Sequence, residues 1–77
     1  MLIEFVEFII TELVEDRSSV TVSSVHQDGK QNITVRVSEQ DFGRVIGKGG
    51  QTIRSIRSLI SSLNKDKSNP VVVEITK

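Results

Sequence analysis

The sequence predicts an α+β domain in which three helices cover one face of a three-stranded mixed sheet. Apolar residues recur at helical spacing in segments 2–15 and 51–63. They alternate with polar residues in segments 19–26 and 31–38, as in half-buried strands. The chain has 77 residues, which is enough for one domain, so we treat 1–77 as a single unit.

The first helix, at 2–15, has a broad apolar surface. Its main apolar side is made by Leu2, Phe5, Val6, Ile9 and Leu13, with the glutamates mostly on the other side. Ile3, Phe8, Ile10 and Val14 extend the apolar surface beyond one stripe. Either the domain covers this helix on more than one side, or the helix contributes to a dimer contact.

Two strands follow, at 19–26 and 31–38. Asp28-Gly29 separates them, and this dipeptide is a strong signal for a tight hairpin. In the first strand, the alternation of valines slips across Ser23-Ser24, which predicts a β-bulge there.

A short helix is expected to begin after Ser38, which has the character of an N-cap. Asp41 lies three residues later, where its charge favours the start of a helix. This helix ends at Ile46, because the glycines that follow favour an open turn.

The longer helix at 51–63 places Ile53, Ile56, Ile60 and Leu63 on its apolar face. Pro70 then opens a last strand at 71–75. The element order is therefore helix, strand, strand, helix, helix, strand. A right-handed crossover would pair 31–38 in parallel with 71–75 and antiparallel with 19–26.

The charges are unevenly distributed along the chain. The 10 basic and 10 acidic residues give a formal net charge of zero. Residues 1–16 hold five of the acidic residues and none of the basic ones, so the rest of the chain has an excess of five positive charges. A basic surface of this kind attracts phosphate even when the whole chain is neutral.

The residues needed for catalysis or metal binding are scarce. The chain has no cysteine, and its one histidine, His26, lacks the partners of a zinc site or a catalytic triad. We therefore expect no enzyme activity, cofactor or metal. The apolar start lacks a preceding positive charge, and no segment is long enough to span a bilayer, so we expect a cytoplasmic protein without membrane contact.

The segment Gly47-Lys48-Gly49-Gly50 is the most informative part of the sequence. Its glycines allow a nucleic-acid backbone to approach the main chain closely. The following helix begins at this loop, so its free N–H groups and dipole favour an anion there. Lys48 adds a positive charge at the tip. The spacing matches neither a P-loop nor a dinucleotide fingerprint.

Basic and apolar residues flank the glycines on both sides. Arg44 and Arg54 contribute positive charge, while Ile46 and Ile53 are candidates to line a shallow apolar surface for unstacked bases. The three phenylalanines fall at expected core positions, so aromatic base stacking is not expected. We therefore assign these four residues, together with Gly47, Lys48, Gly49 and Gly50, as candidate residues for binding single-stranded nucleic acid.

The stretch Ile46-Gly47-Lys48-Gly49-Gly50-Gln51-Thr52-Ile53 resembles the KH-domain signature, in which a GxxG loop lies between isoleucines. The helix-first order is similar to the type II, or prokaryotic, KH arrangement, and the layout resembles the stand-alone KhpA-like proteins of bacteria. The resemblance implies single-stranded RNA binding through the loop and a role as a low-specificity RNA chaperone or post-transcriptional regulator. It also implies a homodimer, or a heterodimer with a larger KH protein.

Two alternatives remain at this stage. A helix–hairpin–helix DNA-binding unit also presents a glycine-rich turn to phosphate. A protein-interaction or dimerisation module with little nucleic-acid affinity fits the zero net charge and Gln51, which stands where the similar proteins often carry arginine.

Overall fold

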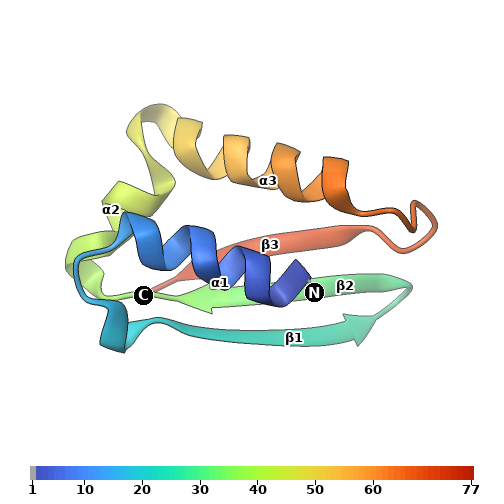
Figure 1. Ribbon diagram of the computed structural model, residues 1–77, viewed down its shortest axis with the longest axis horizontal. Coiled ribbons are helices and arrows are strands. Elements are labelled where there is room, and N and C mark those ends of the chain that lie inside the picture. Colours follow the sequence, from blue (N-terminus) through green and yellow to red (C-terminus); the bar gives the residue numbers. More distant parts are fainter. Residues whose placement is uncertain (1) are drawn as a thin grey trace.

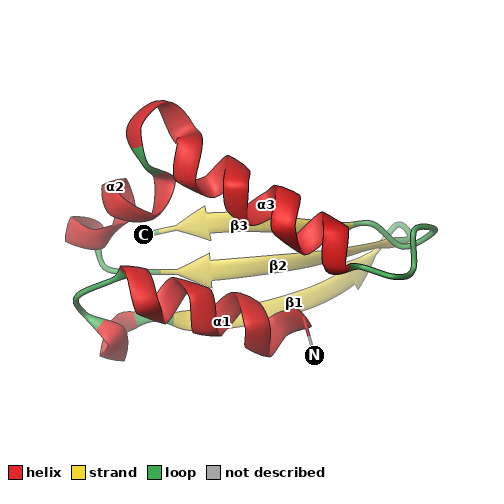
Figure 2. Cartoon of the chain, turned by 45° about the horizontal axis from the view of Figure 1, so that its top comes forward, coloured by secondary structure: helices red, strands yellow, loops and turns green. Residues whose placement is uncertain are grey.

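A computed structural model describes residues 2–77, and Met1 lies outside the described residues. The elements follow the predicted order: α1 (Leu2–Leu13), β1 (Thr21–Gln27), β2 (Lys30–Arg36), α2 (Glu39–Ile46), α3 (Gln51–Leu63) and β3 (Val71–Thr76). The three helices lie on one face of the sheet (Figure 1, Figure 2), which confirms the predicted α+β class.

The sheet has the order β1-β2-β3, so β2 is central. It pairs antiparallel with β1 and parallel with β3, as predicted. The register from Thr21↔Arg36 to Gln27↔Lys30 is unbroken, so the predicted bulge is wrong. Val22 packs against the core under the helices, whereas Val25 is 56% exposed on the open face. The valines change faces along a regular strand, and no extra residue is needed.

The hairpin turn agrees with the prediction from Asp28-Gly29. Both residues have positive φ, 55° at Asp28 and 73° at Gly29. A two-residue hairpin of this kind matches the right-handed twist of its strands, and Asp and Gly tolerate the left-handed conformation better than other residues.

The first helix is shorter than predicted. It ends at Leu13, because the main-chain N–H groups of Glu15 and Asp16 donate to the carboxylate of Asp41 instead of continuing the helical ladder. The boundaries of α3, in contrast, are those predicted from its periodicity.

The core lies between the helices and the covered face of the sheet. It is formed by Val6, Ile10, Val14, Ile33, Val35, Val37, Val45, Ile53, Ile56, Ile60, Val73 and Ile75. The expected core position of Phe8 is wrong, because its ring is 61% exposed. Phe8 lies two residues from both Val6 and Ile10, which places it on the opposite side of α1. Leu63, expected on the apolar face of α3, is also exposed, at 45%.

Candidate nucleic-acid interface

Three glycines with positive φ form the connection between α2 and α3. Gly47 has φ 81° and ψ 167°, Gly49 has φ 63°, and Gly50 has φ 76°. The N–H of Gly47 donates to the carbonyl of Gly43 at 2.8 Å and closes α2. The N–H of Gly50 donates to the carbonyl of Gly47 at 3.0 Å and closes the loop itself. The loop therefore turns sharply in a conformation that side chains oppose.

The glycines differ in the space around them. A Cβ on Gly47 would overlap the side chain of Thr52 and lie 2.7 Å from its main-chain nitrogen. A Cβ on Gly49 would meet nothing within 4 Å. Gly47 is thus required for packing as well as for conformation, whereas Gly49 faces open space.

The tip of the loop is accessible. Lys48 and Gly49 are exposed, and within residues 2–77 no hydrogen bond or ion pair engages the ammonium of Lys48. No carboxylate of the described chain is bonded to the loop. Helix α3 begins at Gln51, so the positive end of its dipole lies directly beside this exposed cation.

Arg54 binds the loop from within α3. Its Nη1 donates to the carbonyl of Gly49 at 2.9 Å. The remaining N–H groups of the guanidinium stay available beside the loop, because one such bond uses only one of its five donors. Arg54 thus stabilises the turn and adds charge to the same site.

Arg44, the other predicted cation, is paired with an acid. Its Nη2 lies 3.1 Å from Oε1 of Glu15, and both side chains are more than half exposed. An exposed pair of this kind contributes little to stability, but it offsets positive charge next to the loop.

The flanking apolar residues separate into surface and core. Ile46 is half-buried and packs against the core from the side of the loop. Ile53 is only 4% exposed and lies in the core itself. Of these two predicted residues, Ile46 therefore has the larger accessible surface, and Ile53 anchors the start of α3.

Asp41 positions the helix that leads into the loop. It is fully buried, and its carboxylate accepts N–H bonds from Glu15 at 3.1 Å and Asp16 at 3.0 Å, and a hydroxyl bond from Ser38 at 2.9 Å. The amides of Asp16 and Glu15 hold the pKa of Asp41 below its ordinary value despite burial. The sequence predicted that the charge of Asp41 favours the start of α2. In the structure, the carboxylate also ties α2 to the segment after α1.

Arg57 was not among the predicted site residues. Its Nε donates to the carbonyl of Val73 in β3 at 3.0 Å. The sequence signal for it was its place one turn after Arg54, on the same flank of α3. The strand that it contacts lies 16 residues away and could not be identified from that spacing.

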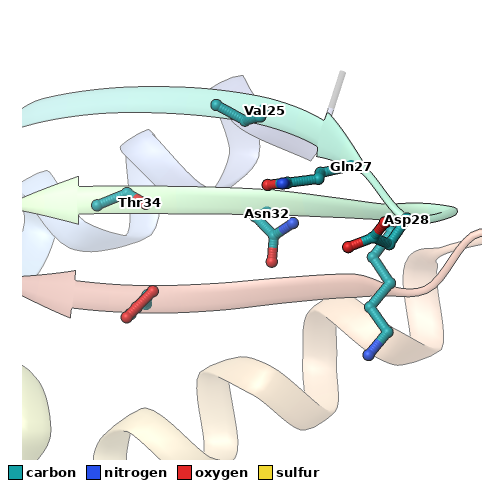
Figure 3. Close-up of a pocket in the computed structure, with 7 residues that line it drawn as sticks. Val25, Gln27, Asp28, Asn32 and Thr34 are labelled. Carbon is teal, nitrogen blue, oxygen red and sulfur yellow. The ribbon is translucent and has the colours of Figure 1, made fainter.

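The open face of the sheet carries a hollow away from the loop. It is lined by Val25, Gln27, Asp28, Lys30, Asn32, Thr34 and Glu74 (Figure 3). The labelled side chains come from β1, β2 and their hairpin, on the face away from the helices. These groups mix both charges with amides and a valine, and they do not define one ligand chemistry.

Among residues 2–77 there is no cluster of His, Cys, Asp and Glu suited to a metal ion. None of the helices described is both long and apolar enough to cross a bilayer.

A three-stranded mixed sheet under three helices, with a GxxG loop joining the second and third, is the architecture of a type II KH domain. The family described as "KhpA/KhpB, KH domain" matches residues 3–75. The chain belongs to this family.

Similar proteins cover nearly the whole chain. An RNA-binding protein KhpA of Thermotoga maritima is 34% identical over 74 residues, which is 96% of this chain and 97% of that protein. The RNA-binding protein KhpA of Clostridium perfringens is 35% identical over 94% of this chain and 96% of its own length. That of Borreliella burgdorferi is 32% identical over 95% and 89%, respectively. The comparison with solved structures gave no match.

Proposed function

We propose that this protein binds single-stranded RNA, without catalysis, at the Gly47–Gly50 loop. The observation that carries the proposal is the accessible loop tip, where the exposed Lys48 stands at the start of α3. Family membership and relatives named RNA-binding proteins support RNA as the ligand. The strands on either side of the helix–loop–helix unit favour this function over a helix–hairpin–helix DNA binder.

In this proposal the loop binds the sugar–phosphate chain and the neighbouring side chains support it. Gly49 lets the backbone approach, and Lys48 and the start of α3 supply positive charge. Arg54 orders the loop through Gly49 and reaches phosphate with its other N–H groups. Ile46 provides apolar contact for an unstacked base, while Ile53 supports it from the core.

We propose that two such domains act together, as a homodimer or with a larger KH protein, in a cytoplasmic RNA-chaperone or regulatory role. Phe8 on α1 and Leu59 and Leu63 on α3 have exposed apolar side chains, which support association. Two linked sites raise avidity through effective concentration even when each binds weakly. Sedimentation with and without RNA tests the homodimer, and a monomer in both conditions would contradict it.

The loop assignment is tested by replacing Lys48 and Gly49 with aspartate. The pair reverses the charge at the tip, and we expect RNA affinity to fall at least roughly tenfold, since both the cation and the close approach are lost. Fluorescence anisotropy with an unstructured RNA measures the affinity, and circular dichroism monitors folding. Asp tolerates the left-handed conformation of position 49, and no atom lies within 4 Å of its Cβ.

The hairpin provides a matched control. Replacing Gly29 and Lys30 with aspartate makes the same charge change. Gly29, like Gly49, has a left-handed conformation and open space where a Cβ would lie. The hairpin lies at the end of the molecule away from the loop (Figure 1), so this variant should keep its RNA affinity. Equal losses in both variants would show a general charge effect and reject the loop as the site. Duplex DNA as competitor distinguishes RNA from DNA binding.

A further inference from the structure

The edge of the sheet next to α3 is formed by β3. Its pairing with β2 is parallel, and the carbonyls of Pro70 and Thr76 accept bonds from Gln31 and Val37. Main-chain groups alternate in direction along a strand, so those of Val71 and Val73 point away from β2. This edge runs alongside α3 (Figure 1), and Arg57 of that helix contacts it.

Arg57 spans from α3 to this edge. The bond from its Nε to the carbonyl of Val73, at 3.0 Å, fixes the plane of the guanidinium. The Nη1 and Nη2 groups make no hydrogen bond or ion pair within residues 2–77, and the side chain is exposed. A guanidinium held by Nε presents its two outer nitrogens as a pre-oriented pair of donors.

We propose that Arg57 determines base preference in the RNA site, by donating two hydrogen bonds to a base that presents two adjacent acceptors. This inference rests on the proposed function. Guanine presents O6 and N7, and cytosine presents O2 and N3, whereas the edges of adenine and uracil alternate donors with acceptors. Bases of a single strand have these edges free, and Arg57 lies one turn beyond the arginine that holds the loop.

The carbonyl of Val73 is essential to this role. A free arginine would lose side-chain entropy when it bound a base, whereas the bond to Val73 has already ordered this one. Lysine keeps the charge but has no planar pair of donors. Arg57→Lys therefore separates base recognition from general attraction to phosphate.

The experiment compares unstructured oligonucleotides of equal length that contain only adenine and uracil, or the same sequence with single guanine or cytosine substitutions. We expect the wild type to bind at least one substituted series about tenfold more tightly, the value for one good bidentate contact. Arg57→Lys should bind every series with the affinity that the wild type has for the oligonucleotides of adenine and uracil alone. The salt dependence of its binding should be unchanged. Arg36→Lys, an exposed arginine on β2, is the matched control and should keep the preference.

The outcomes separate this inference from the proposed function. Equal wild-type binding to all series overturns the base preference alone. Loss of affinity for all series in Arg57→Lys, together with a lower melting temperature, shows that the residue only ties α3 to β3 and also overturns it. A wild type that binds none of the oligonucleotides overturns the proposed function and this inference with it.

Discussion

The carboxylate of Asp41 is the most constrained polar group near the loop. It is fully buried at the start of α2 and accepts hydrogen bonds from two main-chain amides beyond the end of α1. The sequence predicted the helix start and the acidic residue in its first turn. Its partners lie 25 and 26 residues earlier, and main-chain amides carry no sequence signature, so the contact itself could not be predicted.

Asp41→Asn should destabilise the protein. The amide that replaces one oxygen is a donor, and it would face the N–H groups of Glu15 or Asp16 or the hydroxyl of Ser38. We expect the melting temperature to fall by roughly 5 °C or more, as for a broken buried network in a small domain. Glu39→Gln, an exposed acid in the same turn, is the control and should shift it little. Equal shifts in the two variants would contradict the buried role.

The same carboxylate makes stability depend on pH. Hydrogen bonds from Asp16 and Glu15 lower the pKa of Asp41 in the folded state. The stabilisation is therefore complete above about pH 5 and is lost as the pH falls below the ordinary value of about 3.9 and through the lowered pKa. Thermal melts should show the difference between wild type and Asp41→Asn narrowing from pH 7 to pH 3. A constant difference would mean that Asp41 is not ionised in the folded protein at neutral pH.

At the scale of elements, two of the three loop glycines differ in what a side chain would cost at their positions. Gly47 combines a main-chain conformation nearly restricted to glycine with contact against Thr52, whereas Gly49 needs only the left-handed conformation. Gly49→Ala should lower the free energy of unfolding by about 1 kcal/mol, and Gly47→Ala by about 3 kcal/mol. Urea denaturation measures both, and similar losses would show that the contact with Thr52 relaxes at little cost.

The elements themselves were largely predictable, for reasons that differ between them. Helix α3 follows from its periodic isoleucines, and the hairpin follows from Asp28-Gly29, because both signals are local. Phe8 was misplaced because an apolar residue on a helix has the same signature whether the domain or a partner covers it. The bulge at Ser23-Ser24 was wrong because exposed Val25 was counted as an inward residue. In the loop, the glycines and Lys48 were identified from the sequence, whereas the bonds of Arg54 and Arg57 depend on tertiary geometry.

Across the whole molecule, an ion pair links the acidic N-terminal segment to the basic remainder of the chain. Glu15 follows α1 and pairs with Arg44 beside the loop, so part of the positive excess expected from the sequence is offset. The positive charge of Arg54 is not offset by its hydrogen bond, because the acceptor is a neutral carbonyl. Lys48 and Arg54 are therefore the two cations that we expect to contact phosphate.

This distribution predicts a weak dependence of RNA binding on salt. Two phosphate contacts on a single strand give a slope of about −1.4 for log K against log salt concentration, at roughly −0.7 for each contact. Lys48→Gln should reduce the magnitude of the slope by about 0.7. Arg44→Gln should leave it unchanged, because that charge is already offset. Anisotropy titrations over a series of salt concentrations measure each slope.

Glu15→Gln provides the reverse test of this charge balance. Removing the carboxylate releases Arg44 beside the loop, so RNA should bind more tightly and the slope should steepen toward about −2.1, the value for three phosphates. Glu12→Gln is the control: that acid lies near Arg17 instead, at 3.7 Å, and its loss should leave the slope at the wild-type value. If Glu15→Gln has no effect while Arg44→Gln weakens binding, RNA already displaces Glu15 in the wild type. Arg44 would then be a third phosphate contact, despite its partner in the free protein.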